Sequence, residues 1–243
     1  MKRILGGVIA VLIFIVLALA FVHIPFGNID LAEYHYYNPV DNEHTQDSVP
    51  QHYLDEGKKE TGSTNIVTAV VVDYRGFDTL GEVTVLFLAS TGVGSIMYIF
   101  EKEKRRKVRR ANAVVETASK LLFGFIILFG AYIFVHGHLT PGGGFPGGAV
   151  IASSFLLLYL AYPRFHAEHK NLNIAESLAG LTFVGVGILG LFLAGYFLYN
   201  FLPFGLPTYL FSAGVIPVIY VAVGVKVGSE LTGIVDAMMG VRE

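Results

Sequence analysis

Six apolar stretches constrain this chain more than any other feature of its sequence. A helix needs about 20 apolar residues to cross the hydrocarbon core of a bilayer. Charged residues make up only 15% of the chain, whereas they make up about a quarter of a typical soluble domain. We therefore predict an all-α integral membrane protein with about six transmembrane helices, at residues 4–22, 80–100, 121–135, 147–162, 174–199 and 209–227.

Lysine and arginine residues indicate how these helices are oriented. Lys2 and Arg3 precede the first stretch, segment 101–110 holds seven basic residues, and Arg164 and Lys170 lie between the fourth and fifth stretches. With six spans, all of these residues fall on one side, which the positive-inside rule assigns to the cytoplasm. We expect a multi-pass protein of the cell membrane with both termini in the cytoplasm.

The first stretch has an alternative interpretation. Lys2 and Arg3, the apolar run after them, and the small residues Ala18 and Ala20 are also typical of a secretory signal peptide with its cleavage site. Removal of such a peptide would leave the orientation of the other helices unchanged. The run is long enough to cross a membrane, which favours a retained helix.

Segment 101–110 also divides the chain into two parts. Residues 1–100 form a predicted two-helix module with a polar outer segment at 28–63, and residues 111–243 form a predicted four-helix module. The hydrophilic segment between them is the predicted cytoplasmic linker. No internal repeat relates the two parts, so we interpret them as two membrane modules joined in one chain.

Four ionisable residues lie at the outer lip of the second predicted helix, namely Asp73, Arg75, Asp78 and Glu82. A charged side chain costs roughly 2.5–3.5 kcal/mol at the centre of a bilayer, so such residues usually have a partner or a function. If the helix starts at Arg75, then Arg75, Asp78 and Glu82 share one face. The pattern favours an ion or proton site, to which Thr79 adds a hydroxyl group.

Each of these residues also has a simpler interpretation. A carboxylate near a helix N-terminus gains about 0.3–1 kcal/mol from the helix dipole, so Glu82 also suits a capping role. Arg75 and Asp78 are able to neutralise one another at the interface. Asp73 is typical of a solvated loop residue, and Thr79 fits a helix N-cap or its neighbour.

A glycine-rich helix break follows the third predicted helix. Segment 136–148 has six glycines and two prolines in thirteen residues, which cannot continue a helix. Non-helical backbone at membrane depth is packed in protein or lines a watery cavity, where its polar groups can bind ions. A tight turn is the alternative, with His138 as a hydrogen-bond anchor. The candidate residues are His138, Pro141, Gly142, Gly143, Gly144, Phe145, Gly147 and Gly148.

Two further observations concern ionisable groups. Lys226 and Glu230 lie four residues apart at the cytoplasmic end of the sixth predicted helix, as a further ionisable pair or as interfacial side chains.

Histidine pairs at 136/138 and 166/169 have spacings seen at metal sites, but their surroundings do not favour a metal site, and we expect no metal. The chain has no cysteine, which excludes disulfides and thiolate ligands.

Two motifs carry a resemblance to a known family. Segment 65–90, with Val72-Asp73-Tyr74-Arg75-Gly76-Phe77-Asp78-Thr79-Leu80-Gly81-Glu82, resembles the C-terminal part of the large A subunit of Mrp-type sodium/proton antiporters. It also resembles a small separate subunit of archaeal membrane-bound hydrogenases. From about residue 111 onward, with Gly137-His138 and Pro141-Gly142-Gly143-Gly144-Phe145-x-Gly147-Gly148, the chain resembles the antiporter B subunit.

The resemblance covers roughly residues 64–243, and the fusion of its two parts differs from a standalone antiporter. It implies a membrane arm of an archaeal ferredoxin-dependent respiratory complex, either a membrane-bound hydrogenase or the related sulfane sulfur reductase. It further implies a subunit that is not an enzyme by itself, holds no cofactor, works with other subunits in the lipid bilayer and binds no nucleic acid. Na⁺ and H⁺ would be the transported ions.

Two classes of function follow from the resemblance. In the first, the chain contributes to the sodium path, and Glu82, Pro141 and Phe145 match positions regarded as functionally sensitive in the antiporters. In the second, the chain is a structural scaffold that packs antiporter modules together without contacting the ion. Small residues in the fifth predicted helix, which favour close helix packing, suit either class.

Overall fold

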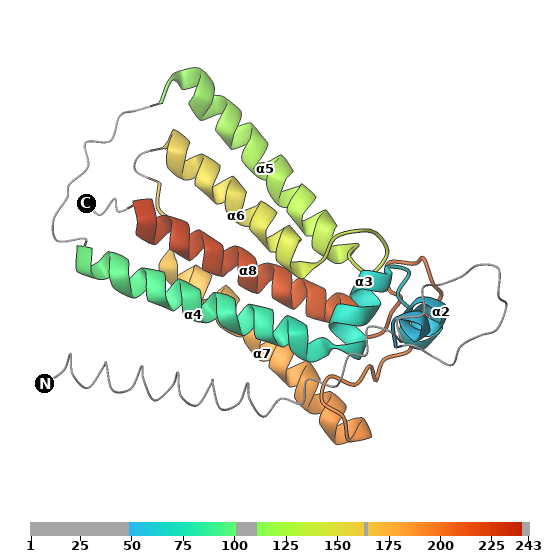
Figure 1. Cartoon of the computed structure of the whole chain (residues 1–243). Helices are drawn as coiled ribbons and strands as arrows, with labels where there is room; N and C mark the ends of the chain where they lie inside the picture. Colours follow the sequence, from blue (N-terminus) through green and yellow to red (C-terminus); the bar gives the residue numbers. More distant parts are fainter. Residues whose placement is uncertain (1–48, 101–110, 163–164, 240–243) are drawn as a thin grey trace, which may run out of the picture. The chain divides into compact units, whose positions relative to one another are not determined.

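The computed structural model describes residues 49–100, 111–162 and 165–239. The predicted helix at 4–22, most of the polar segment 28–63 and the linker 101–110 lie outside these residues. Every regular element within them is helical, in agreement with the predicted fold class (Figure 1). The elements are α2 (Val49–Thr61), α3 (Ile66–Thr68), the π-helix η2 (Ala69–Tyr74), α4 (Gly76–Phe100), α5 (Ala113–Val135), α6 (Gly144–Ala161), α7 (His169–Ala194) and α8 (Ile216–Met239).

Five of these helices, α4 to α8, are long and apolar enough to cross a membrane. The remaining predicted span, residues 4–22, lies outside the described residues. α8 lies at the centre of the bundle and contacts α4, α5, α6 and α7, while α5 packs mainly on α6 (Figure 1). The core accordingly forms around α8, with Ile216, Ile219 and Val223 packed against Val72, Val83 and Phe183.

Glycines allow α6 to approach its neighbours closely. A Cβ atom on Gly147 would lie 2.7 Å from the Gly130 carbonyl oxygen of α5, and one on Gly148 would lie 2.6 Å from the Gly224 carbonyl oxygen of α8. No side chain fits at those distances, so backbone packs directly on backbone. Small residues serve helix association in membranes in this way.

The helices α4, α5, α6 and α7 begin four, eight, three and five residues before their predicted starts. The last two helices also differ elsewhere. α7 ends at Ala194 rather than continuing to residue 199, because Gly195 adopts a left-handed conformation (φ 80°) and its N–H donates to the Leu191 carbonyl. The chain then folds back, and the Leu198 N–H donates to the Gly187 carbonyl. α8 starts at Ile216 rather than 209 and continues twelve residues past the predicted end at 227, to Met239.

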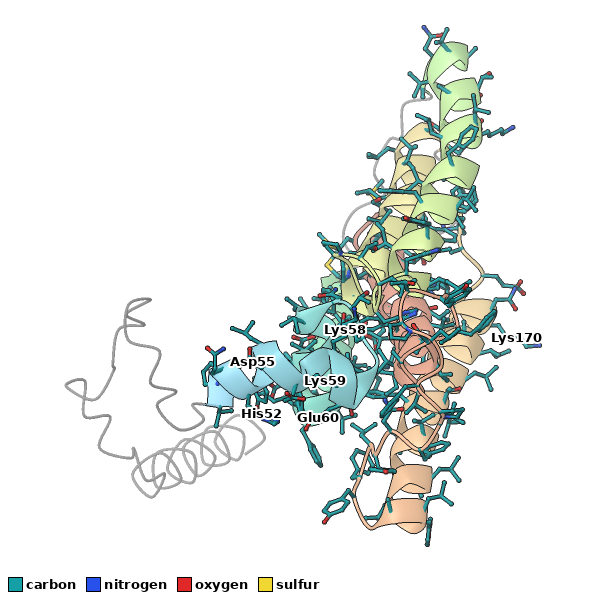
Figure 2. The ribbon with its side chains drawn as sticks, turned by 90° about the vertical axis from the view of Figure 1, so that its right-hand side faces the viewer. His52, Asp55, Lys58, Lys59, Glu60 and Lys170 are labelled. Atoms are coloured by element: carbon teal, nitrogen blue, oxygen red, sulfur yellow. The ribbon has the colours of Figure 1, made fainter. Side chains whose placement is uncertain are left out.

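The short elements before α4 form a polar cap at one end of the bundle. α2 exposes the charged side chains of Asp55, Lys58 and Lys59 (Figure 2). On its other side, the Tyr53 ring stacks on Tyr74 of η2 with a centroid distance of 4.6 Å. Segment 66–72, predicted to be too short to cross the membrane, forms α3 and the first part of η2.

Candidate functional site

The glycine-rich loop is bound to the segment that precedes η2. The Gly137 carbonyl accepts from Asn65 Nδ2 (2.9 Å) and from Thr68 Oγ1 (2.7 Å). The His138 carbonyl accepts from the backbone N–H groups of Thr64 and Asn65 (3.1 Å each) and from Ser63 Oγ (2.9 Å). Two elements about 70 residues apart in the chain therefore meet, and we call this contact between residues 63–68 and 137–140 the joint.

The joint supplies donors to carbonyl groups of the loop that follows α5, which has no helical hydrogen bonds of its own to satisfy them. The Leu139 carbonyl accepts from Thr64 Oγ1 (3.0 Å), and the Thr140 carbonyl accepts from Asn65 Nδ2 (3.0 Å). Each carbonyl oxygen has two lone pairs, so those of Gly137 and His138 have their full complement of donors. These two oxygens are occupied within the chain and are not free for an ion.

His138 supplies its backbone rather than its side chain to this contact. Its imidazole is completely buried, and neither ring nitrogen has a hydrogen-bond partner among the described residues. Burial lowers the pKa of His138, and the nearby backbone of Tyr209 and Leu210 opposes this shift in part. The predicted anchor of the loop is therefore the His138 carbonyl group.

The other residues of the glycine motif fall into two groups. Gly143, Gly144, Gly147 and Gly148 are buried against Tyr220 and α8 or against α5. Pro141, Gly142 and Phe145 are exposed on the surface of this chain. The buried glycines shape the bundle, whereas Pro141 and Phe145 are available to a neighbouring molecule.

The π-helix η2 leads into α4, and a salt bridge joins Arg75 to Asp78 at this transition, which we call the foot of α4. Arg75 Nε lies 2.8 Å from Asp78 Oδ2, with both side chains about half exposed. The Thr79 hydroxyl donates to the Val71 carbonyl at 2.7 Å, which ties the first turn of α4 to η2. π-helical turns are rare and are often found at functional sites. The hydrogen of the Thr79 hydroxyl is thus engaged in this bond.

Asp73 is bound within the protein rather than placed as a solvated loop residue. Its Oδ2 accepts from Asn200 Nδ2 at 3.3 Å, and Asn200 Oδ1 accepts from the Val215 N–H at 2.8 Å. Burial raises the pKa of Asp73 to about 6. This contact connects η2 to the segment between α7 and α8.

Glu82 is the seventh residue of α4 and lies on its exposed side. No hydrogen bond or salt bridge to Glu82 is found in the part of the chain that the structure describes. α4 is also the least buried of the five spans, with 6% of its most apolar window buried. The structure brings Arg75 and Asp78 together, but leaves Glu82 outside that pair.

Lys226 and Glu230 lie in the interior of the membrane bundle, not at its cytoplasmic end as predicted. Lys226 Nζ is 2.5 Å from Glu230 Oε1 and 3.5 Å from Glu176 Oε1 of α7. The Lys226 ammonium also lies 5.1 Å from the centre of the Phe87 ring of α4. The predicted helix ended at residue 227 because Lys226 and Glu230 interrupt the apolar stretch, so the pair was predicted to lie at its end. In the structure α8 continues to Met239.

A second polar cluster lies near the end of α8. Asp236 accepts from the Tyr159 hydroxyl at 2.7 Å, lies 2.7 Å from His169 Nε2 and lies 3.5 Å from His166 Nδ1. The Asp236 side chain is 8% exposed. Glu176 and Asp236 were not predicted as site residues, although His169 and Glu176, seven residues apart, share one face of α7.

Two family models match consecutive parts of the chain. Residues 26–113 match the family described as the E subunit of MBH. Residues 114–233 match the family described as a domain related to the MnhB subunit of Na⁺/H⁺ antiporters.

Individual relatives agree with these matches. An uncharacterized protein of Methanocaldococcus jannaschii is 32% identical over an alignment of 194 residues, which covers 69% of this chain and 74% of that protein. The B subunit of a Na⁺/H⁺ antiporter of Bacillus subtilis is 41% identical over 83 residues, or 34% of this chain and 52% of that protein.

Two solved structures contain similar chains. One is the membrane-bound sulfane sulfur reductase, an archaeal respiratory membrane complex, with 44% identity, a TM-score of 0.69 and 98% of both chains covered. The other is the Mrp complex of a Dietzia species, with 22% identity and a TM-score of 0.65, where the match covers 98% of this chain and 26% of that one. The second likeness shows a common fold.

Proposed function

We propose that this chain contributes to a sodium path. It belongs to the family of Mrp-type antiporter subunits, and it joins a part related to the MBH E subunit to an MnhB-related part. It is a membrane subunit of a multi-subunit sodium/proton antiporter module. The module works within an archaeal ferredoxin-dependent respiratory complex of the sulfane sulfur reductase type, a choice supported by the end-to-end match at 44% identity. Na⁺ and H⁺ are the transported ions.

In this assignment the chain acts through its neighbours. It is not a catalyst by itself and carries no cofactor, because the redox chemistry lies in other subunits of the complex. Its partners are those subunits and the lipid bilayer. The ends of α4, α6 and α8 and the first turns of α5 and α7 lie at one end of the bundle (Figure 1). The basic residues of the linker and Lys170 support a cytoplasmic location for that end and for both termini.

The exposed position of Glu82 is the observation that carries the proposal. An ionisable side chain on a membrane helix almost always faces protein or a watery cavity, and not lipid. The described part of this chain provides no partner for Glu82 and leaves α4 almost uncovered. We infer that a neighbouring subunit covers α4, and that Glu82 lies in the interface where an ion can pass between the two.

The joint gives the glycine motif its part in this function. It fixes residues 63–68, and through η2 it fixes the foot of α4, against the end of α5. The same motif exposes Pro141 and Phe145 to a neighbouring subunit. The motif thus holds α4 in place rather than binding the ion through the Gly137 and His138 carbonyl groups.

Sodium-dependent proton exchange by the assembled complex tests the proposal. In membrane vesicles, Glu82→Gln should lower the exchange at least about tenfold, because the path loses its charged group, while the subunits still co-purify. Glu116→Gln, a similar change in the first turn of α5, is the matched control and should leave exchange unchanged. Normal exchange in the Glu82→Gln complex would overturn the role of Glu82 in the path.

A scaffold role is the second candidate, favoured by the occupied carbonyl groups of the joint and by exposed apolar side chains on α7. Phe192 is 82% exposed and Leu181 is 69% exposed. A Cβ atom at Gly185 of α7 would meet no atom of this chain within 4 Å. If α7 packs on a partner, Gly185→Leu should reduce the yield of assembled complex, and exchange should fall only in proportion to that yield.

A further inference from the structure

Three ionisable side chains meet inside the bundle, away from Glu82. Lys226 Nζ contacts both Glu230 Oε1 (2.5 Å) and Glu176 Oε1 (3.5 Å). The Glu230 side chain is fully buried, and only 12% of the Lys226 side chain is exposed. We call these three residues the α7–α8 cluster.

The α7–α8 cluster lies at mid-membrane depth. Lys226 is the eleventh of the 24 residues of α8, so at a rise of about 1.5 Å per residue it lies roughly 15 Å from the start of the helix. The hydrocarbon core of a bilayer is about 30 Å thick. A charge that the protein leaves unbalanced at this depth is therefore costly.

The charges of the α7–α8 cluster do not balance. One ammonium group faces two carboxylates, which leaves one negative charge if all three groups are ionised. In addition, Glu230 Oε2 is buried and has no hydrogen-bond partner in the part of the chain that the structure describes. A buried charge of this kind is too costly to persist, so the group takes up a compensating cation or proton.

A proton fits this site better than a metal ion does. Hard metal cations take about six oxygen ligands, whereas the described residues around the cluster supply two carboxylates and place an ammonium group between them. The third neighbour, Phe87 of α4, offers only the face of its ring. One proton on either carboxyl group removes the excess charge and needs no further ligand.

We propose that the α7–α8 cluster binds one exchangeable proton in the middle of the membrane and receives it from the Asp236 end of the bundle. The step is a simple proton transfer: a hydronium ion or a protonated His169 gives up H⁺, and a carboxylate of Glu176 or Glu230 becomes the carboxylic acid. The Lys226 ammonium contacts both carboxyl groups and holds them together.

The geometry of α7 connects the two polar clusters. His169 contacts Asp236, and Glu176 contacts Lys226. His169 and Glu176 share one helix face about 10 Å apart, and Asn173 lies between them on that face. On α8, Gly233 lies between Glu230 and Asp236, and a Cβ atom at Gly233 would meet no atom within 4 Å. The proposed route passes through this open space beside Gly233, where water would bridge the two clusters.

Counting protonated carboxyl groups in the purified complex tests the site independently of transport. The carboxylic-acid band in the infrared spectrum should contain one proton from the α7–α8 cluster at neutral pH, and it should shift in heavy water. Glu230→Gln and Glu176→Gln should each remove that contribution, because one ammonium and one carboxylate remain and balance. Lys226→Met should increase the band, because two carboxyl groups are then left without a cation.

Glu82→Gln is the reference in this experiment, since a change there leaves the cluster intact and should not alter the band. An unchanged band in both the Glu176→Gln and Glu230→Gln complexes would overturn the proposal, because it would mean that neither carboxyl group holds a proton. Co-purification of the subunits with each variant establishes that the compared complexes are assembled.

The route is tested by filling the space at Gly233. Gly233→Val should slow proton movement in vesicles at least about tenfold, because a side chain then replaces the bridging water, while the infrared band keeps its size. Gly124→Val of α5, where a Cβ atom also meets nothing within 4 Å, is the matched control and should move protons at the normal rate. Equal rates for the two variants would overturn the route from the Asp236 end.

Discussion

α8 and α4 each carry a glutamate within an apolar helix, and the two side chains lie in opposite environments. Glu230 of α8 is fully buried beside Lys226, whereas Glu82 of α4 is exposed with no partner in the described part of the chain. The most apolar window of α8 is 56% buried, and that of α4 is 6% buried. The described part of the chain thus provides a counter-ion for Glu230 in its interior and none for Glu82 on α4.

The largest effect is expected from a substitution that disrupts the close packing around α8. Gly148→Val should lower the free energy of unfolding by about 3 kcal/mol, because the new side chain meets the Gly224 carbonyl oxygen and the backbone cannot move away cheaply. Gly81→Val on α4 meets nothing within 4 Å and is the control. Thermal unfolding of the purified complex measures both. Equal losses would mean that α4 is as tightly covered as α8.

A smaller effect is expected at the joint. Asn65→Ala removes two hydrogen bonds to loop carbonyls and the cap of α3, so unfolding should become easier by about 2 kcal/mol. Asn112→Ala removes one long cap bond of 3.4 Å at α5 and should cost about 0.5 kcal/mol. Limited proteolysis of segment 136–143 reports the opening of the loop. A loop that stays protected in Asn65→Ala would contradict this role.

The pH dependence of stability tests the environment of Asp73, which lies in η2 just before α4. The folded protein raises the pKa of Asp73 from 3.8 to about 6, so the protonated form stabilises the fold. This contribution is complete below about pH 4 and is lost as the pH rises through 6. Allowing for partial exposure, wild-type stability should fall by about 1.5 kcal/mol from pH 4 to pH 7 relative to Asp73→Asn. Parallel pH profiles for the two proteins would contradict the shift.

The smallest effect is expected at the exposed salt bridge. Arg75→Gln should change the free energy of unfolding by about 0.5 kcal/mol, because Arg75 and Asp78 are about half exposed and solvent screens the pair. The difference should vanish at high salt. If Arg75→Gln instead prevents assembly of the complex, the guanidinium group binds a partner subunit and the α4 face is more polar than this chain alone indicates.

The sequence predicts the helices well where apolar residues are continuous, and less well where a charge is paired on another helix. The apolar stretch of α8 ends near Lys226 in the sequence, because hydropathy assigns every lysine the same cost. In the fold, Glu176 and Glu230 offset that cost, and the helix continues to Met239. The end of α7 was missed for the opposite reason, since residues 196–199 are apolar yet follow the left-handed Gly195.

For the candidate sites too, the sequence predicts local structure but not contacts between distant segments. The motif at 136–148 was recognisable as a helix break from its glycines and prolines alone. Which groups satisfy its carbonyls depends on Ser63, Thr64, Asn65 and Thr68, about 70 residues earlier in the chain. No local pattern in the sequence connects the two segments.

The joint has a consequence for how the chain can be made. It lies at the opposite end of the bundle from the point where α4 ends and α5 begins (Figure 1). Contacts of α4 and η2 with α8 add to it, so the two parts are held by non-covalent bonds that do not involve residues 101–110. A gene split within that segment should therefore yield two polypeptides that find one another in the membrane and rebuild the same subunit.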